Sequence, residues 1–297
     1  NPMSFRDLNR CGTDVADIFV AVTPDETVYI IACGMAKECG ARKCVARVDN
    51  PEFATPRAED MLRRHGVDLT IFPEKLAAME TQRFIEHNWV SEWFQFHRGE
   101  LYVVGVRMEA SGSLCGKYLR DIPNNPRLFH VSAIKRGSGI IIPRGDDRLL
   151  EGDTLYFSVL PENIDLLPDL CGKRVSRARR IMITGAGRVT ENLLDLIGPK
   201  YDVTVIDPDP ERCRKVAEKF PKAVVVNALA NDVTTLKEEG IDGCDTFLAL
   251  TGSSEKNIVS CMVAREHGAR RTLARIEELQ YIPEAESLSI DKIINKK

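Results

Sequence analysis

Short apolar runs alternate with amphipathic stretches along both ends of the chain. Residues 17–23 (DIFVAVT) and 245–251 (DTFLALT) are apolar and contain Val, Ile or Phe, which predicts buried strands. Each run is followed by a helical stretch that ends at a glycine, and then by a second strand at residues 42–48 or 270–276. This order of strand, helix and strand predicts an α/β fold with a parallel sheet.

The two strand–helix–strand units are copies of one another. Residues 8–48 match residues 236–276 without gaps at an offset of 228, and 16 of the 41 positions are identical. Average residue usage would give about two or three identities by chance. We call the region around each copy a lobe. Further α/β pattern precedes the second copy from Ala178 but is missing before the first, so we expect a tandem truncated at both ends.

The residues between the copies follow a different pattern. Residues 94–107 and 129–157 alternate with a period of two and carry turn residues between the apolar runs, which predicts a small antiparallel sheet. Residues 114–119 are expected to form a short helix. Four aromatic residues are expected to seat this middle domain on the first lobe, namely Trp89, Trp93, Phe94 and Phe96.

The pattern divides the chain into four consecutive segments. A partial first lobe is expected at 1–85, the middle domain at 86–172, a basic linker at 173–179 and a nearly complete second lobe at 180–297. The basic linker fits a solvated connection, and contact with an anionic partner is the alternative.

Composition and charge narrow the classes of function. Lys and Arg number 41 against 44 Asp and Glu, a net charge of −3, so no strong field recruits nucleic acid. Apolar runs stay far below the 18–20 or so residues of a membrane helix, so a membrane role would need a partner. The nine cysteines are scattered along the chain, and we expect them to be reduced thiols. Cys33 and Cys261, which are equivalent in the two copies, are expected to pack in the core. The five histidines lack metal-ligand spacing, and no metal site is predicted.

A glycine turn opens the second lobe. An apolar strand runs into residues 185–190 (GAGRVT), a helical pattern follows, and a second strand ends at Asp207. This is the context of a dinucleotide-binding fingerprint. Gly185 permits the tight turn, Gly187 lets a pyrophosphate approach the backbone, and the helix start favours the phosphate charge. Asp207 can accept from ribose hydroxyls and would repel a 2′-phosphate, which favours NAD or another adenosine nucleotide over NADP.

One position departs from the fingerprint. Thr190 replaces the third glycine, and we expect it to push the helix outward or to force repacking. The alternative to a binding site is a degenerate lobe that keeps the fold without the ligand.

Two further positions recur in both copies. Thr23 and Thr251 follow their strands at the carboxyl edge, where ligands of open α/β sheets bind, although each could instead cap the next helix. Arg47 and Arg275 lie in apolar strands and need a partner, since burying an unpaired charge is costly. A phosphate, a carboxylate of the neighbouring lobe or a structural ion pair would each serve.

Several motifs together resemble a known family. They are Ala21-Val22-Thr23 followed by Asp25-Glu26, Ala46-Arg47-Val48-Asp49, Ile142-Pro143-Arg144-Gly145-Asp146 with Leu150-Glu151-Gly152-Asp153, and Gly185-Ala186-Gly187-Arg188-Val189. Over essentially its whole length the chain resembles the TrkA-type subunits of bacterial Trk potassium uptake, which are tandem regulator-of-potassium-conductance (RCK) proteins. The resemblance implies Rossmann-type RCK N-lobes flanking a small α+β RCK C-domain.

The resemblance also implies a function. Such proteins lie in the cytoplasm, peripheral on the inner face of the plasma membrane, and gate potassium uptake through a TrkH- or TrkG-like translocating subunit. They are not enzymes, they bind NAD or NADH, or ATP or ADP in relatives, and they assemble as homodimers or tetrameric rings. Matched by position, the nucleotide contacts in the second lobe would be Gly185, Ala186, Gly187, Arg188, Val189, Asp207, Thr251 and Arg275, and in the first lobe Thr23 and Arg47.

The chain departs from the family pattern at two more places. The Gly-Asp-Ala of the family after the third strand is here Ala228-Leu229-Ala230, and the Asn kept at Asn257 is Tyr29 in the first copy. Two other functions stay open. One is a nucleotide sensor for a different cation channel or exporter. The other is an NAD-dependent dehydrogenase, which would need a general acid or base that neither copy shows beyond the glycine turn.

Overall fold

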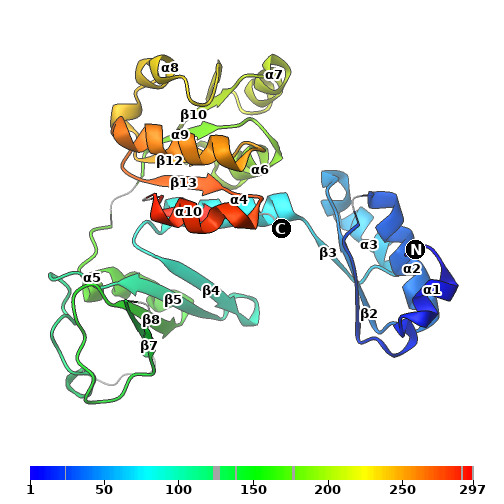
Figure 1. Ribbon diagram of the computed structural model, residues 1–297, viewed down its shortest axis with the longest axis horizontal. Helices are drawn as coiled ribbons and strands as arrows, with labels where there is room; N and C mark the ends of the chain where they lie inside the picture. Colours follow the sequence, from blue (N-terminus) through cyan, green and yellow to red (C-terminus); the bar gives the residue numbers. More distant parts are fainter. Residues whose placement is uncertain (24, 123–127, 138, 176–177, 289, 296–297) are drawn as a thin grey trace.

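The computed structural model describes residues 1–297 apart from 24, 123–127, 138, 176–177, 289 and 296–297, so part of the predicted basic linker lies outside the described residues. The described residues form a three-stranded, a five-stranded and a six-stranded sheet. Figure 1 shows the six-stranded sheet and the five-stranded sheet on one side of the molecule and the three-stranded sheet apart from them. No helix in the described part of the chain is both long and apolar enough to cross a membrane.

The second lobe is an open parallel sheet with helices on both faces. Its strands lie in the order β11-β10-β9-β12-β13-β14, and all neighbouring pairs are parallel, which confirms the predicted α/β sheet. The order reverses between β9 and β12, the kind of switch point where open α/β sheets bind ligands. The elements are β9 (Arg180–Thr184), α6 (Arg188–Ile197), β10 (Asp202–Asp207), α7 (Pro210–Lys219), β11 (Val224–Asn227), α8 (Val233–Glu238), β12 (Thr246–Ala249), α9 (Ser254–Glu266), β13 (Thr272–Arg275), α10 (Ile282–Ser287) and β14 (Lys292–Ile294).

The first lobe has the same order of strands and helices, but its helices cover only one face of its sheet. Helices α2 and α3 bury the side that carries Cys44 and Ala46, and Cys33 lies in that core as predicted. The opposite side is bare, since Ile18 and Val20 of β1 are 59% and 53% exposed. The prediction of a buried strand is therefore wrong for one face of β1. The elements are α1 (Phe5–Arg10), β1 (Ile18–Ala21), α2 (Glu26–Cys39), β2 (Lys43–Arg47), α3 (Pro56–Arg64) and β3 (Leu69–Ile71), with parallel strands in the order β1-β2-β3.

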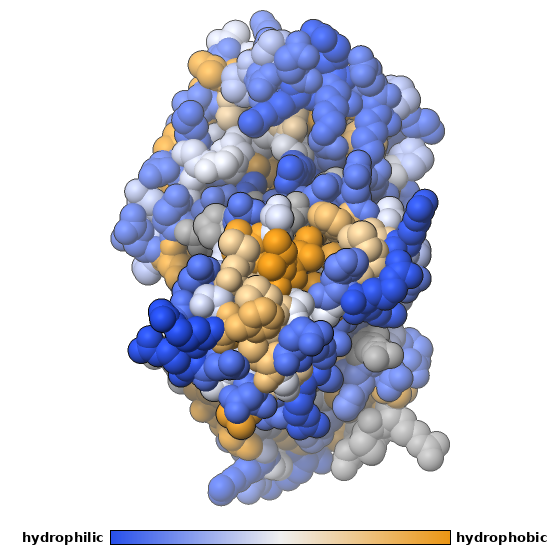
Figure 2. All heavy atoms as spheres, turned by 90° about the vertical axis from the view of Figure 1, so that its right-hand side faces the viewer, coloured by the Kyte–Doolittle hydropathy of each residue, from blue (hydrophilic) through white to orange (hydrophobic). Residues whose placement is uncertain are grey.

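Other hydrophobic side chains of this lobe are exposed as well. Viewed from the side on which the first lobe lies, the molecule shows a hydrophobic patch edged by hydrophilic side chains (Figure 2). The equivalent strand of the second lobe, β12, is buried at all four positions. Two copies of one sequence unit thus occupy different environments.

Helix α4 (Pro73–Glu86) leaves the first lobe and packs on the second. It packs against α6 on one face of the six-stranded sheet, whereas α10 packs with α9 on the other face. Its buried side chains Ala78, Phe84 and Ile85 share one core with α6 and with alternate residues of the central strands. Residues 73–85, which the sequence analysis placed in the first lobe, thus complete the core of the second.

The end of α4 is held by an arginine of the second lobe. Arg271 places its guanidinium 3.8 Å from the centre of the Phe84 ring and donates a hydrogen bond of 2.8 Å to the Phe84 carbonyl. Burial lowers the pKa of Arg271 to about 10, so the side chain remains charged at neutral pH. The cation thus contacts both an aromatic face and the negative end of the helix dipole.

The middle domain is the predicted antiparallel sheet. Its strands are β4 (Glu92–Phe96), β5 (Leu101–Arg107), β6 (His130–Arg136), β7 (Gly139–Ile141) and β8 (Thr154–Val159), in the order β4-β5-β8-β6-β7, and α5 (Leu167–Cys171) follows. The predicted helix at 114–119 is wrong: Gly116 has a φ of +79°, and turns lead into a 3₁₀ segment at Leu119–Asp121.

The aromatic residues of this domain do not contact the first lobe as predicted. Trp89 and Trp93 belong to the core of the middle domain itself. Phe94 and Phe96 are 47% and 49% exposed. The prediction that all four seat the domain on the first lobe is therefore wrong. Trp93 instead lines a pocket with α4, the helix that packs on the second lobe.

A buried carboxylate holds the turn before β8. Asp153 accepts hydrogen bonds of 2.8 and 2.7 Å from Arg136 Nε and Nη2 and one of 2.9 Å from the Leu150 N–H. Burial opposes ionisation of this group, but the hydrogen bonds from Arg136 and Leu150 outweigh it and lower the pKa of Asp153.

Asp153→Asn is therefore expected to lower the free energy of unfolding of the middle domain by about 2 kcal/mol at pH 7, since it breaks charged hydrogen bonds. Because the folded-state pKa is depressed, the stabilisation is complete above about pH 3.8 and is lost as the pH falls further. Both tryptophans lie in this core, so urea unfolding followed by tryptophan fluorescence reports on it.

The matched control is Asp146→Asn, which removes an exposed carboxylate paired with Arg120 and should cost less than about 1 kcal/mol. Equal losses in the two variants at pH 7 would contradict a special role for Asp153.

Candidate functional site

The glycine turn at the carboxyl end of β9 is shaped by its two neighbouring strands. Gly185 has a φ of +102°, and a Cβ atom there would lie 2.9 Å from the Thr251 nitrogen. Gly187 is different, because its φ is −91° and a Cβ atom would meet no heavy atom within 4 Å. Gly185 is thus required by the fold, whereas Gly187 leaves a space open at the start of α6, where free N–H groups favour an anion.

Asp207 is bonded directly to this turn. Its carboxylate accepts hydrogen bonds from the Ala186 N–H at 2.7 Å and from the Asp209 N–H at 2.8 Å, and the residue is 4% exposed. Each carboxylate oxygen can accept a second hydrogen bond. The acid at the end of β10 therefore both fixes the turn and keeps acceptors for a ligand hydroxyl.

Thr251 lies across the turn from Gly185 and is held by Asn257. The Thr251 hydroxyl donates to Asn257 Oδ1 at 2.6 Å, and Asn257 Nδ2 donates to the carbonyls of Arg275 at 2.7 Å and Thr251 at 3.0 Å. Asn257 thus ties the ends of β12 and β13 together.

The alternative role of the two threonines, as helix caps, is wrong. The N-cap of α9 is Ser253 and that of α2 is Asp25. Thr23 donates to the Asp25 carbonyl at 3.2 Å and is half-buried, and it follows β1 at the carboxyl edge of the first lobe.

The repeated arginines each pair with an acid two residues further on. Arg275 bonds Glu277, and Arg47 Nε lies 3.5 Å from Asp49 Oδ1. Of the three alternatives for this partner, the structure shows an ion pair within each lobe. Arg275 is 9% exposed, and its buried Nε has no hydrogen-bond partner within the described part of the chain. A polar ligand group at this edge would satisfy that donor.

Thr190 is accommodated inside the turn. It is fully buried, and its hydroxyl donates to the Gly185 carbonyl. The extra polar group is thus satisfied where a glycine would have none. Leu229, which replaces the acid of the family pattern, follows β11 and is 62% exposed.

The two lobes touch at this edge. Arg188 Nη1, from the turn of the second lobe, donates to the Asp49 carbonyl of the first lobe at 2.9 Å. The structure therefore brings residues 185–189, Asp207, Thr251 and Arg275 to one sheet edge and places Asp49 of the first lobe beside it. Sequence reasoning missed this contact because it joins residues 139 positions apart.

The space at Gly187, the carboxylate beside it and the unpartnered donor of Arg275 fit a phosphate-containing nucleotide. In the described residues no group of His, Cys, Asp and Glu is arranged to hold a metal ion.

Comparison with known proteins agrees with this architecture. The model of the TrkA-N domain matches residues 1–73 and 181–296, and that of the TrkA-C domain matches residues 103–172. A solved structure titled "GsuK channel bound to NAD" superimposes with a TM-score of 0.68 at 17% identity, covering 100% of this chain and 52% of that one. At this identity the likeness shows the fold alone, and it confirms Rossmann-type N-lobes around a small C-domain.

Sequence relatives cover almost the whole chain. A Trk system potassium uptake protein trkA homolog 1 from Methanosarcina mazei is 32% identical over 94% of this chain and 71% of its own length. Trk system potassium uptake protein TrkA from Halomonas elongata is 29% identical over 97% of this chain and 64% of its own length. The chain thus spans about two thirds of the relatives it matches, and by its N- and C-domains and its sequence it belongs to the TrkA family.

Proposed function

We propose that the chain is a nucleotide-binding regulator that gates potassium uptake through a membrane Trk-type translocating subunit. The observation that carries this proposal is the side-chain-free space at Gly187 beside the Asp207 carboxylate. The names of the relatives, as proteins of Trk potassium uptake, support the cation and the system.

The second lobe is the proposed binding site. Backbone N–H groups of residues 185–189 would take the phosphates, Asp207 the ribose hydroxyls, and Thr251 and Arg275 the adjacent part of the ligand. In the first lobe, Thr23 and Arg47 remain the proposed contacts. NAD or NADH is favoured, with ATP or ADP as the alternative, because Asp207 would repel a 2′-phosphate, and a structure of similar fold is titled as bound to NAD.

Nucleotide would act by changing how the lobes meet. A ligand shifts such an equilibrium only by binding the two arrangements unequally. Arg188 supplies a physical link, because it bonds the Asp49 carbonyl and also begins the helix at which the phosphates would lie. A phosphate that attracts this guanidinium would weaken the contact between the lobes.

The same proposal includes the setting of the protein. We place it in the cytoplasm, peripheral on the inner face of the plasma membrane, as a homodimer or tetrameric ring on a TrkH- or TrkG-like subunit. The division into 1–85, 86–172, 173–179 and 180–297 belongs to this proposal, with α4 as the connection between the lobes. We assign no enzymatic activity, because the proposed ligand contacts include no His, Lys or Tyr for proton transfer. A regulator of another cation channel or exporter is the second candidate.

The two glycines of the turn separate ligand binding from folding. Gly187→Ala is expected to fold normally and to lose nucleotide affinity by at least about 10-fold, because its methyl group fills the phosphate space. Gly185→Ala is expected to lower the melting temperature, since its Cβ would collide with the backbone that follows β12 and its positive φ would be strained. Calorimetry with NAD, NADH, ATP and ADP and thermal unfolding measure the two effects.

Unchanged nucleotide affinity in a folded Gly187→Ala protein would contradict the proposed site. If no nucleotide binds the unaltered chain, the lobe is a degenerate one, and the regulatory proposal fails with it.

Asp207→Ala is expected to weaken NAD binding by at least about 10-fold, equivalent to about 1.4 kcal/mol, and to reduce the preference for NAD over NADP. The matched control is Asp209→Ala, which removes the carboxylate that caps α7 by accepting from the N–H groups of Glu211 and Arg212. Both variants lose a buried or capping acid, but only the first loses a ligand contact. Equal affinities in the two variants would exclude Asp207 as the ribose acceptor.

A further inference from the structure

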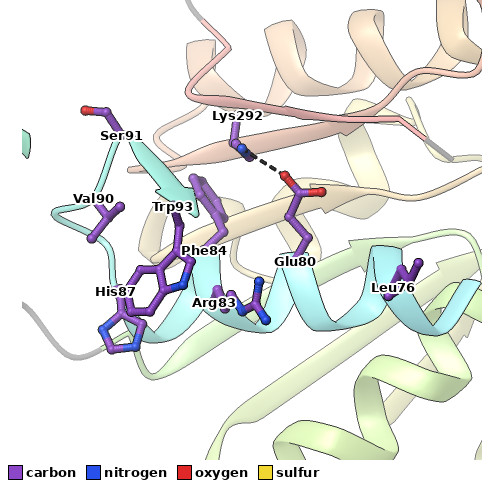
Figure 3. A pocket seen from close by; sticks show the side chains of 9 residues that line it. All are labelled: Leu76, Glu80, Arg83, Phe84, His87, Val90, Ser91, Trp93 and Lys292. Atoms are coloured by element: carbon purple, nitrogen blue, oxygen red, sulfur yellow. Dashed lines mark ion pairs between the residues drawn. The ribbon is translucent and has the colours of Figure 1, made fainter. Parts of the chain in front are cut away.

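A pocket lies between helix α4 with the residues after it, the middle domain and the second lobe. It is apart from the proposed nucleotide site at the carboxyl edge of the six-stranded sheet. Its walls come from α4, from the residues that follow it, from β4 of the middle domain and from β14 of the second lobe. Figure 3 shows Lys292 of β14 reaching Glu80 of α4, with His87 beside Trp93 at the end of the helix. A ligand in this pocket would therefore contact all three parts at once.

The polar side chains of the pocket carry a positive balance. Arg83 and Lys292 are cationic, and one carboxylate, Glu80, lies 2.9 Å from Lys292 Nζ. Burial lowers the pKa of His87, which is thus neutral at pH 7. Arg83 Nη2 donates to Gln95 Oε1 at 2.9 Å, which fixes the guanidinium on the wall. Two cations against one carboxylate suit an anionic group.

Two other side chains of the lining, Phe84 and Trp93, are aromatic and held in place by their neighbours. The Trp93 indole stacks on the His87 ring with centroids 4.8 Å apart and planes at 29°. The Arg271 guanidinium, which does not line the pocket, lies 3.8 Å from the centre of the Phe84 ring and holds that ring in place. Two fixed rings beside two cations are the kind of lining that binds an apolar ring bearing a charged group.

We propose that this pocket binds a small aromatic anion, with its ring against Trp93 and Phe84 and its carboxylate or phosphate at Arg83 and Lys292. Any movement of β4 against α4 and β14 would change the shape of the pocket. A bound anion would therefore favour one placement of the middle domain against the second lobe. The site is separate from Asp207 and the glycine turn, and it does not depend on the proposed function.

Phenyl phosphate serves as the probe, with calorimetry for affinity and tryptophan fluorescence for location. The unaltered chain is expected to bind it at one saturable site with a change in fluorescence. Arg83→Gln and Lys292→Gln are each expected to weaken binding at least 10-fold. Arg214→Gln removes the same charge from an exposed ion pair with Glu211 on α7 and is expected to leave affinity unchanged. Circular dichroism and melting temperature establish that each variant folds.

Two further ligands and one further variant decide between explanations. Inorganic phosphate and benzyl alcohol should each bind at least 10-fold more weakly than phenyl phosphate, because each lacks half of the recognised group. Gly187→Ala, which closes the proposed phosphate space at the glycine turn, should bind phenyl phosphate as the unaltered chain does. Equal binding of inorganic phosphate, loss of binding in Gly187→Ala, or full binding in both folded glutamine variants would each overturn the proposal.

Discussion

The structure depends on the burial of one face of α4 against the second lobe. The helix is encoded directly after the first lobe, yet its apolar positions close one side of the six-stranded sheet together with α6. Full burial of side chains such as Phe84 and Ile85 contributes roughly 1.5–3 kcal/mol each. Arg271 adds a hydrogen bond to the last turn and a cation over the ring. Removing α4 from the second lobe would expose this surface, so the helix is part of the core of that lobe.

The proposed nucleotide site results from the order of the strands in the second lobe. Because β9 lies between β10 and β12, the residues after these three strands converge, and the acid of one strand bonds the turn of the next. The same adjacency excludes a side chain at Gly185, since the end of β12 occupies that space. At Gly187 nothing occupies it. Two glycines two residues apart therefore have different roles, one in folding and one in ligand access.

The duplicated units show how context alters equal sequences. Arg47 and Arg275 pair with acids at the same spacing, but Arg275 is buried and Arg47 is partly exposed. Asn257 joins two strand ends, whereas the equivalent position in the first copy holds the buried Tyr29. The apolar strand is enclosed in the second lobe and bare on one face in the first. Side-chain chemistry is shared between the copies, while burial depends on what lies above each sheet.

The strands, the parallel and antiparallel sheets, the duplication and the glycine turn with its acid could all be predicted from the order of the residues. These follow from periodicity and from local backbone requirements, which act over a few residues. Three features became visible only in the folded chain: α4 belongs to the core of the second lobe, Arg188 reaches Asp49, and Trp93 lines a pocket with Lys292. An amphipathic helix shows in sequence that it must bury one face but not against which sheet. Contacts between residues more than a hundred positions apart leave no local pattern.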